Sequence, residues 1–147
     1  MPGILVGVDG SDHSRRALGW AMHEAAQRRA PLTVMMVRPD EVRPATQIFW
    51  GVRATAEKSF DPDHARTALQ EFVDRVAREI GEKVPEVTVS VVMGDVAEEL
   101  LKASRDADLL VVGSRGSGGF AKLLLGSVSS KVAHHAVGPV VVVPEPG

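Results

Sequence analysis

The residues of this chain best suited to bind a charged ligand form one glycine-rich stretch, residues 113–127. It reads Gly-Ser-Arg-Gly-Ser-Gly-Gly-Phe-Ala-Lys-Leu-Leu-Leu-Gly-Ser and holds five of the chain's fourteen glycines. Glycine lets the backbone adopt unusual conformations and approach a ligand closely. An apolar run precedes the stretch at 109–112, and a helical pattern begins near Ser127. Because the first N–H groups of a helix lack intrahelical acceptors and carry partial positive charge, we expect this stretch to bind phosphate.

The spacing within the stretch is more specific than its composition. Two residues separate Gly113 from Gly116, nine more lead to Gly126, and a hydroxyl follows at Ser127. This pattern resembles the nucleotide-binding signature of the universal stress protein family, in its ATP-binding branch. The resemblance extends over nearly the whole chain. Without a ligand, the same residues would form a glycine-rich surface connection.

The resemblance implies a role for each matching residue of the stretch. Gly113 and Gly116 would let the backbone pass close to the ribose and the phosphates. Gly126 would admit phosphate oxygens at the start of the helix, where the backbone N–H groups and hydroxyls of Ser127 and Ser129 would bind them.

Three further residues of this region have both a binding and a structural interpretation. Val128 would offer its N–H to phosphate and point its side chain to the core. Arg115 and Lys122 could pair with phosphates, although a solvated loop cation is the simpler interpretation of each. Lys131 lies one turn into the helix, and the pattern indicates only an exposed side chain.

A second candidate region ends the first apolar run, at 4–8. The resemblance implies that the Asp9 carboxylate binds the ribose hydroxyls, whereas its alternative role is an N-cap or turn carboxylate for the following helix. By the same resemblance, the adenine pocket would be lined by backbone and apolar side chains of Gly7, Val8, Val37 and Val112. Each of these valines would also suit a hydrophobic core.

Motifs of competing chemistries do not match. The run Gly-Ser-Gly-Gly-Phe-Ala at 116–121 mimics a dinucleotide fingerprint, but it follows the wrong strand and lacks the later acidic residue. The five histidines have no metal-ligand spacing, and no triad with a buried acid is indicated.

We therefore expect a nucleotide-binding regulatory protein, with ATP as its ligand and Mg²⁺ bound together with the nucleotide. The alternatives are a slow ATPase, an autophosphorylating protein, or a binder of AMP or a cyclic nucleotide.

Size and composition are those of one domain, residues 1–147. Hydrophobic residues make up 44% and charged residues 24%, with a net charge of −2 and no cysteine. The charge argues against nucleic acid as a partner, and the missing thiols exclude disulfides and thiolate catalysis. Because no signal peptide or long apolar run occurs, we expect a cytoplasmic protein that does not enter the membrane.

The elements that position these residues alternate between short apolar runs and helical patterns, which is typical of an α/β fold. We expect strands at 4–8, 32–37, 87–92, 109–112 and 140–143, with the last helix at 127–136. Right-handed crossovers place helices on both faces of a doubly wound, five-stranded parallel sheet. The order 3-2-1-4-5 is implied by the family resemblance. Ligands of such sheets bind at the carboxyl ends of strands 1 and 4, where the winding reverses.

Two expectations concern contacts outside the glycine-rich stretch. Residues 38–61 form a long connection that carries Phe49 and Trp50, and we expect it to cover the nucleotide or a regulatory protein partner. The last strand, Val140–Val143, is apolar on both faces although the implied order puts it at the edge of the sheet. We therefore expect a homodimer in which two such strands pair across a two-fold axis.

Overall fold

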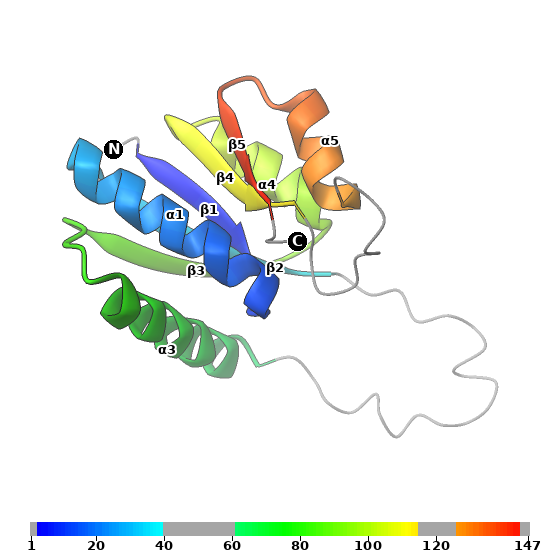
Figure 1. The fold of residues 1–147 in the computed structure, drawn as a ribbon. Helices are drawn as coiled ribbons and strands as arrows, with labels where there is room; N and C mark the ends of the chain where they lie inside the picture. The colour runs from blue at the N-terminus through cyan, green and yellow to red at the C-terminus, as the bar shows by residue number, and fades with distance from the viewer. Residues whose placement is uncertain (1–2, 40–60, 115–125, 145–147) are drawn as a thin grey trace, which may run out of the picture.

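The computed structural model describes residues 3–39, 61–114 and 126–144 (Figure 1). Every expected strand is confirmed, and three of them run one residue further than the apolar pattern. The elements are β1 (Ile4–Val8), α1 (Asp12–Arg28), β2 (Leu32–Arg38), α3 (Pro62–Ile80), β3 (Val87–Met93), α4 (Val96–Ser104), β4 (Leu109–Gly113), α5 (Ser127–His135) and β5 (Val140–Val143).

The five strands form one parallel sheet in the order β3-β2-β1-β4-β5, which confirms the expected topology. Strand β1 pairs with both β2 and β4, so that Ile4 lies opposite Leu32 on one side and Leu109 on the other. The carboxyl ends of β1 and β4 are therefore neighbours. This is the point at which the direction of winding reverses, where sheets of this kind bind their ligands.

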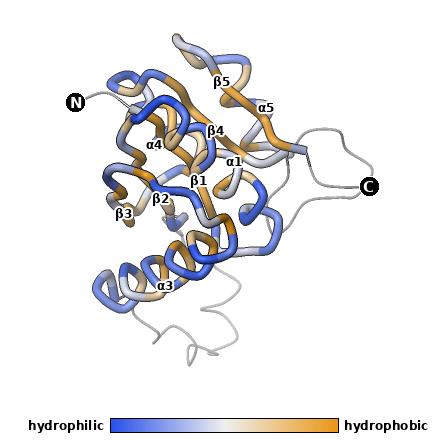
Figure 2. The backbone as a smooth tube through the Cα atoms, turned by 60° about the vertical axis from the view of Figure 1, so that its left-hand side comes forward, coloured by the Kyte–Doolittle hydropathy of each residue, from blue (hydrophilic) through white to orange (hydrophobic). Residues whose placement is uncertain are grey.

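Helices cover both faces of the sheet (Figure 1). On one face, α1 and α3 pack over a core that includes Ile4, Val6 and Val8 of β1. On the other face, α4 and α5 enclose a second core, to which Leu5 of the same strand belongs. A strand with a core on each face is largely apolar, and most of β1, β4 and β5 is coloured hydrophobic in Figure 2.

Helices α3 and α4 end and begin with residues that commonly cap helices. The Asp95 carboxylate accepts a hydrogen bond from the Glu98 N–H at 3.0 Å and so caps α4. Gly81 ends α3 in the left-handed conformation, with its N–H on the Ala77 carbonyl. The last helix ends one residue earlier than expected, because the backbone of Ala136 is already extended.

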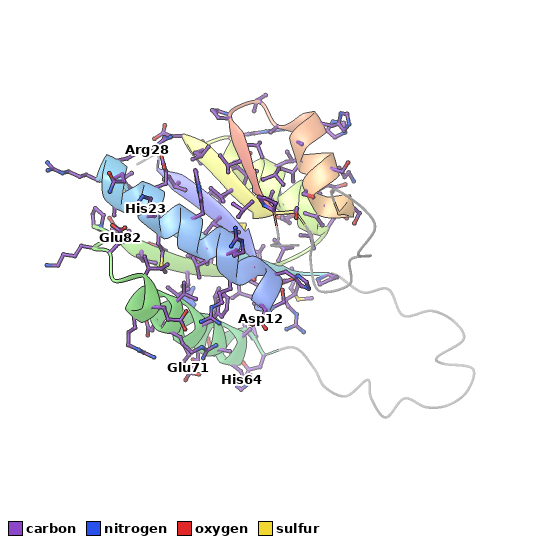
Figure 3. All side chains as sticks on the ribbon, viewed as in Figure 1. Asp12, His23, Arg28, His64, Glu71 and Glu82 are labelled. Carbon is purple, nitrogen blue, oxygen red and sulfur yellow. The ribbon has the colours of Figure 1, made fainter. Side chains whose placement is uncertain are left out.

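Charged side chains join α1 to α3 and its following loop on the outer surface. Arg15 pairs with Glu79, whose hydrogen bond and charge raise the pKa of the guanidinium further. His23 faces Glu82, as Figure 3 shows. The side chains of Arg15, Glu79 and His23 are 40% to 55% exposed, and that of Glu82 is 28% exposed. In the described ranges, no helix is both long and apolar enough to cross a membrane.

Candidate functional site

The two ends of the glycine-rich stretch lie against each other at the carboxyl end of β4. The Ser114 carbonyl accepts the Gly126 N–H at 2.5 Å, and the Ser114 N–H donates to the Val143 carbonyl at 2.9 Å. Strand β4, strand β5 and the start of α5 are thereby tied together at one point. The predicted ligand residues Arg115 and Gly116, together with Lys122, lie outside the described residues.

The partial positive charge at the N-terminus of α5 is not neutralised by an acidic side chain in its first turn. Its N-cap, Gly126, is extended and contributes no side chain, and the first turn contains no acidic residue. The backbone bond from the Ser130 N–H to the Gly126 carbonyl is the first of the helix. The N–H groups of Ser127, Val128 and Ser129 thus have no acceptor within the helix. Because Ser127 is exposed, its hydroxyl lies on the surface beside them.

Ser129 has a structural function that the sequence pattern did not indicate. Its side chain is buried, and the hydroxyl lies 3.1 Å from the Ser114 carbonyl and 3.2 Å from that of Gly126. The hydroxyl proton therefore stabilises the junction of β4 and α5. The backbone N–H of Ser129 is the group of this residue that remains suited to an anion.

Asp9 follows β1 and organises the turn into α1. One of its carboxylate oxygens, Oδ1, accepts the Ser11 N–H at 2.9 Å and also the Ser11 hydroxyl. Gly10 adopts a φ of 83°, a conformation that favours glycine, and Ser11 is the N-cap of α1. The turn function considered for Asp9 is therefore present. Its carboxylate is exposed beside the ends of β1 and β2, and its contact with ribose stays a prediction.

The expected adenine-pocket residues are packed into the cores. Val8 belongs to the core under α1, while Val37 and Val112 belong to the core under α4 and α5. A Cβ on Gly7 would lie 2.9 Å from both terminal methyl groups of Leu100, so this glycine permits the close approach of α4 to β1. These residues can offer a ligand their backbone at the sheet edge, but their side chains serve the fold.

Gly113 ends β4 opposite Val143 of β5 and is half-buried. It therefore lies directly beside the junction formed by Ser114 and Gly126. Of the signature glycines, Gly113 and Gly126 are thus brought together by the fold.

A groove of about 620 Å³ opens between the N-termini of α4 and α5. This volume lies within the range of small-molecule sites. The groove contains two charged residues that sequence reasoning did not assign to a site, Asp95 and Lys131, whose Oδ2 and Nζ atoms are 4.0 Å apart. The described residues that line it are Pro39, Gly94, Asp95, Val96, Ala97, Ser127, Val128 and Lys131.

The spacing of Ser127 and Lys131 could have indicated a shared surface, because residues four apart lie on the same face of a helix. Asp95 follows the end of β3 and so belongs to the same edge of the sheet. Among the described residues, no group of three or more histidine and carboxylate side chains could hold a metal ion. The α5 N-terminus and the Lys131 ammonium group are the features of the groove that suit an anionic ligand.

The fold is a doubly wound α/β sheet with the N-terminus of α5 beside its switch point, which is where proteins of this class generally bind their ligands. The chain belongs to the universal stress protein family, whose model matches residues 2–144.

Individual relatives agree with this assignment. A universal stress protein of Mycolicibacterium smegmatis is 38% identical over 144 residues, which are 96% of this chain and 47% of that protein. The solved structure of UspA from Lactobacillus plantarum superposes with a TM-score of 0.74 at 26% identity, covering 97% of both chains. A universal stress protein solved in complex with cAMP has a TM-score of 0.64 at 29% identity, with 97% and 95% covered. The chain spans about half the length of the curated relatives it matches.

Proposed function

We propose that this domain binds an adenine nucleotide, foremost ATP, at the carboxyl ends of β1 and β4. The phosphates would lie on the N-terminus of α5, and occupancy would set the protein's conformation or its choice of regulatory partner. The observation that carries the proposal is the α5 N-terminus, which has no acidic residue in its first turn and no side-chain cap. Such an end binds anions through its free N–H groups and its dipole.

The groove and the relatives support a ligand of this class. Ser127 and Val128 line the groove, so the α5 N-terminus faces a space of about 620 Å³. A relative at 29% identity has been solved with cAMP, an adenine nucleotide. Magnesium ions commonly use substrate phosphates and water as ligands, with one or two carboxylates. Mg²⁺ would therefore enter with the nucleotide, held mainly by its phosphate oxygens.

Binding is favoured over turnover by the state of the carboxylates at this edge. Asp9 accepts hydrogen bonds from Ser11, and Asp95 accepts one from the Glu98 N–H. Hydrolysis of ATP requires a held metal ion and a positioned water molecule, and both carboxylates are already used in local turns and caps. A slow ATPase or an autophosphorylating protein is the second candidate. Release of ADP from labelled ATP over hours would favour it.

Replacement of Asp9 by alanine should weaken ATP binding by roughly ten- to a hundredfold, since a charged hydrogen-bond acceptor contributes on the order of 1.5–3 kcal/mol. Asp9→Asn is the matched control for the fold, because an amide oxygen can still accept the Ser11 N–H. We expect Asp9→Asn to keep the thermal stability of the parent but to bind ATP less tightly. If both variants bind ATP like the parent, Asp9 acts only in the turn.

We further propose that the protein forms a homodimer through β5. This strand is the last in the sheet order, so one edge of its backbone is unpaired within the described part of the chain. The apolar side chains of β5 are not the reason for expecting a dimer, because they pack against the two cores of the protomer. Val141 packs toward the core under α1, and Val140 and Val142 pack toward the core under α5.

The backbone groups available for dimerisation can be identified from the ladder. The Pro139 carbonyl accepts a hydrogen bond from the Leu110 N–H of β4, and the Val143 carbonyl accepts one from Ser114, the residue after β4. Since successive residues of a strand face opposite sides, the N–H and carbonyl groups of Val140 and Val142 point to the open edge. In an antiparallel pair these two residues would bond each other across the two-fold axis.

Val142→Pro should therefore convert a dimer to a monomer, because it removes half of the pairing N–H donors without breaking a bond to β4. Val142→Ala is the control, since it shortens the same side chain and retains the donor. Analytical ultracentrifugation at tens of micromolar measures the outcome. A monomeric parent, or a proline variant as dimeric as the parent, would contradict this interface.

A further inference from the structure

The groove between α4 and α5 contains an ion pair with little value for stability. The Lys131 Nζ and the Asp95 Oδ2 are 4.0 Å apart, and the two side chains are 49% and 53% exposed. A solvated pair at this separation contributes little to the free energy of folding. Its position in the groove therefore calls for a different explanation.

The charges of the two helix ends are arranged asymmetrically around this pair. The N-terminus of α4 is compensated by its cap Asp95 and by Glu98 and Glu99 in its first turn. The N-terminus of α5 has no acidic residue, and Lys131 lies only one turn further along. A cation near a helix N-terminus is electrostatically unfavourable. The α5 wall of the groove thus has excess positive charge, for which Asp95 is a distant counterion.

We propose that Lys131 is a phosphate-binding residue of the nucleotide site and that Asp95 competes with the nucleotide for it. The inference rests on the proposed function and deepens it. Ser127 and Lys131 are four residues apart and both line the groove, so the ammonium group can reach an anion held by the α5 N–H groups. A bound phosphate would replace Asp95 as the closer counterion. The site would then select nucleotides by their number of phosphates, preferring ATP to AMP and AMP to adenosine.

The competition also defines the function of Asp95. Its carboxylate is the nearby counterion of Lys131 before the ligand binds, and it repels an incoming phosphate. Asparagine caps helices as well as aspartate does, so Asp95→Asn should leave α4 intact. The variant would remove the repulsion and free the ammonium group. Asp95 therefore opposes ATP binding, and its neutralisation should strengthen that binding.

Calorimetric titration of the full chain with ATP, ADP, AMP and adenosine tests the proposal. Lys131→Gln should weaken ATP binding by about tenfold, ADP and AMP binding progressively less, and adenosine binding not at all. Lys131→Arg should restore most of the affinity for ATP, and Asp95→Asn should raise it severalfold. Lys102→Gln is the control with the same change of charge, because Lys102 pairs with Glu99 at 3.7 Å and does not line the groove.

The outcomes separate this inference from the proposed function. A parent protein that binds none of the four ligands overturns both. If the parent binds ATP and Lys131→Gln binds it equally well, only the assignment of Lys131 is wrong. A loss of affinity that is the same for adenosine and ATP would also overturn it, since a structural defect does not depend on the phosphate count.

Discussion

Replacement of Gly126 by valine should abolish detectable ATP binding, a loss of more than a hundredfold, while the protein remains folded. Gly126 has φ −77° and ψ 174°, an extended conformation that valine also adopts. Its N–H bond to the Ser114 carbonyl does not depend on the side chain. The added side chain would instead occupy the space in which phosphate must approach the start of α5. Calorimetric titration measures the binding, and circular dichroism checks the fold.

The matched control is the same substitution beyond the opposite end of this helix. A Cβ on Gly138 meets no atom within 4 Å, and its φ lies outside the left-handed region. Gly138→Val should therefore bind ATP like the parent. A small loss of stability is expected for Gly126→Val alone, because glycine is the better N-cap. If Gly126→Val retains the parent's affinity, phosphate does not approach the backbone at this residue.

Gly7→Ala should destabilise the protein by about 1–3 kcal/mol, because the new methyl group would lie 2.9 Å from both terminal methyls of Leu100. Leu100 is 2% exposed and cannot move into solvent to relieve the contact. Urea unfolding should show a lower midpoint with an unchanged slope. Gly138→Ala, in open space, is the control and should leave the midpoint nearly unchanged.

A double-mutant cycle identifies the cause of this destabilisation. Leu100→Ala alone should cost about 2–5 kcal/mol through the cavity that it creates. In the double variant the alanine methyl at position 7 would partly fill that cavity. The double variant should therefore lose less stability than the sum of the losses of the two single variants. A coupling of at least about 0.5 kcal/mol is expected for residues in contact. Additive losses would mean that Gly7 is needed for something other than the approach of α4.

The fold was largely predictable because the strands at its centre, β1 and β4, are buried on both faces and the edge strand β5 contacts both cores. The apolar runs at 4–8 and 140–143 match β1 and β5 to the residue, since every position of such a strand contacts a core. The order of the strands in the sheet, in contrast, could not be predicted from the hydrophobic pattern. Periodicity identifies elements one at a time, and the order 3-2-1-4-5 came from the resemblance of the chain to a family.

Within the candidate site, only contacts between residues close together in the sequence could be predicted from sequence patterns. The turn at Asp9, Gly10 and Ser11 and the cap at Asp95 each depend on residues within three positions. The hydrogen bond from the Ser129 hydroxyl to the Ser114 carbonyl and the pairing of Asp95 with Lys131 join residues far apart in the chain. Such contacts depend on how α4 and α5 pack together, which no pattern along the sequence specifies.

The most direct test of the proposed site is the response of individual backbone amides to ATP. In the ¹⁵N–¹H correlation spectrum of the labelled protein, the signals of Ser127, Val128 and Ser129 should shift strongly on addition of ATP. Those of His134 and His135, at the other end of α5, should remain in place. Adenosine should produce smaller shifts at the three N-terminal amides, because it lacks the phosphates. Unchanged signals at Ser127–Ser129 in saturating ATP would contradict the placement of the phosphates and with it the proposed function.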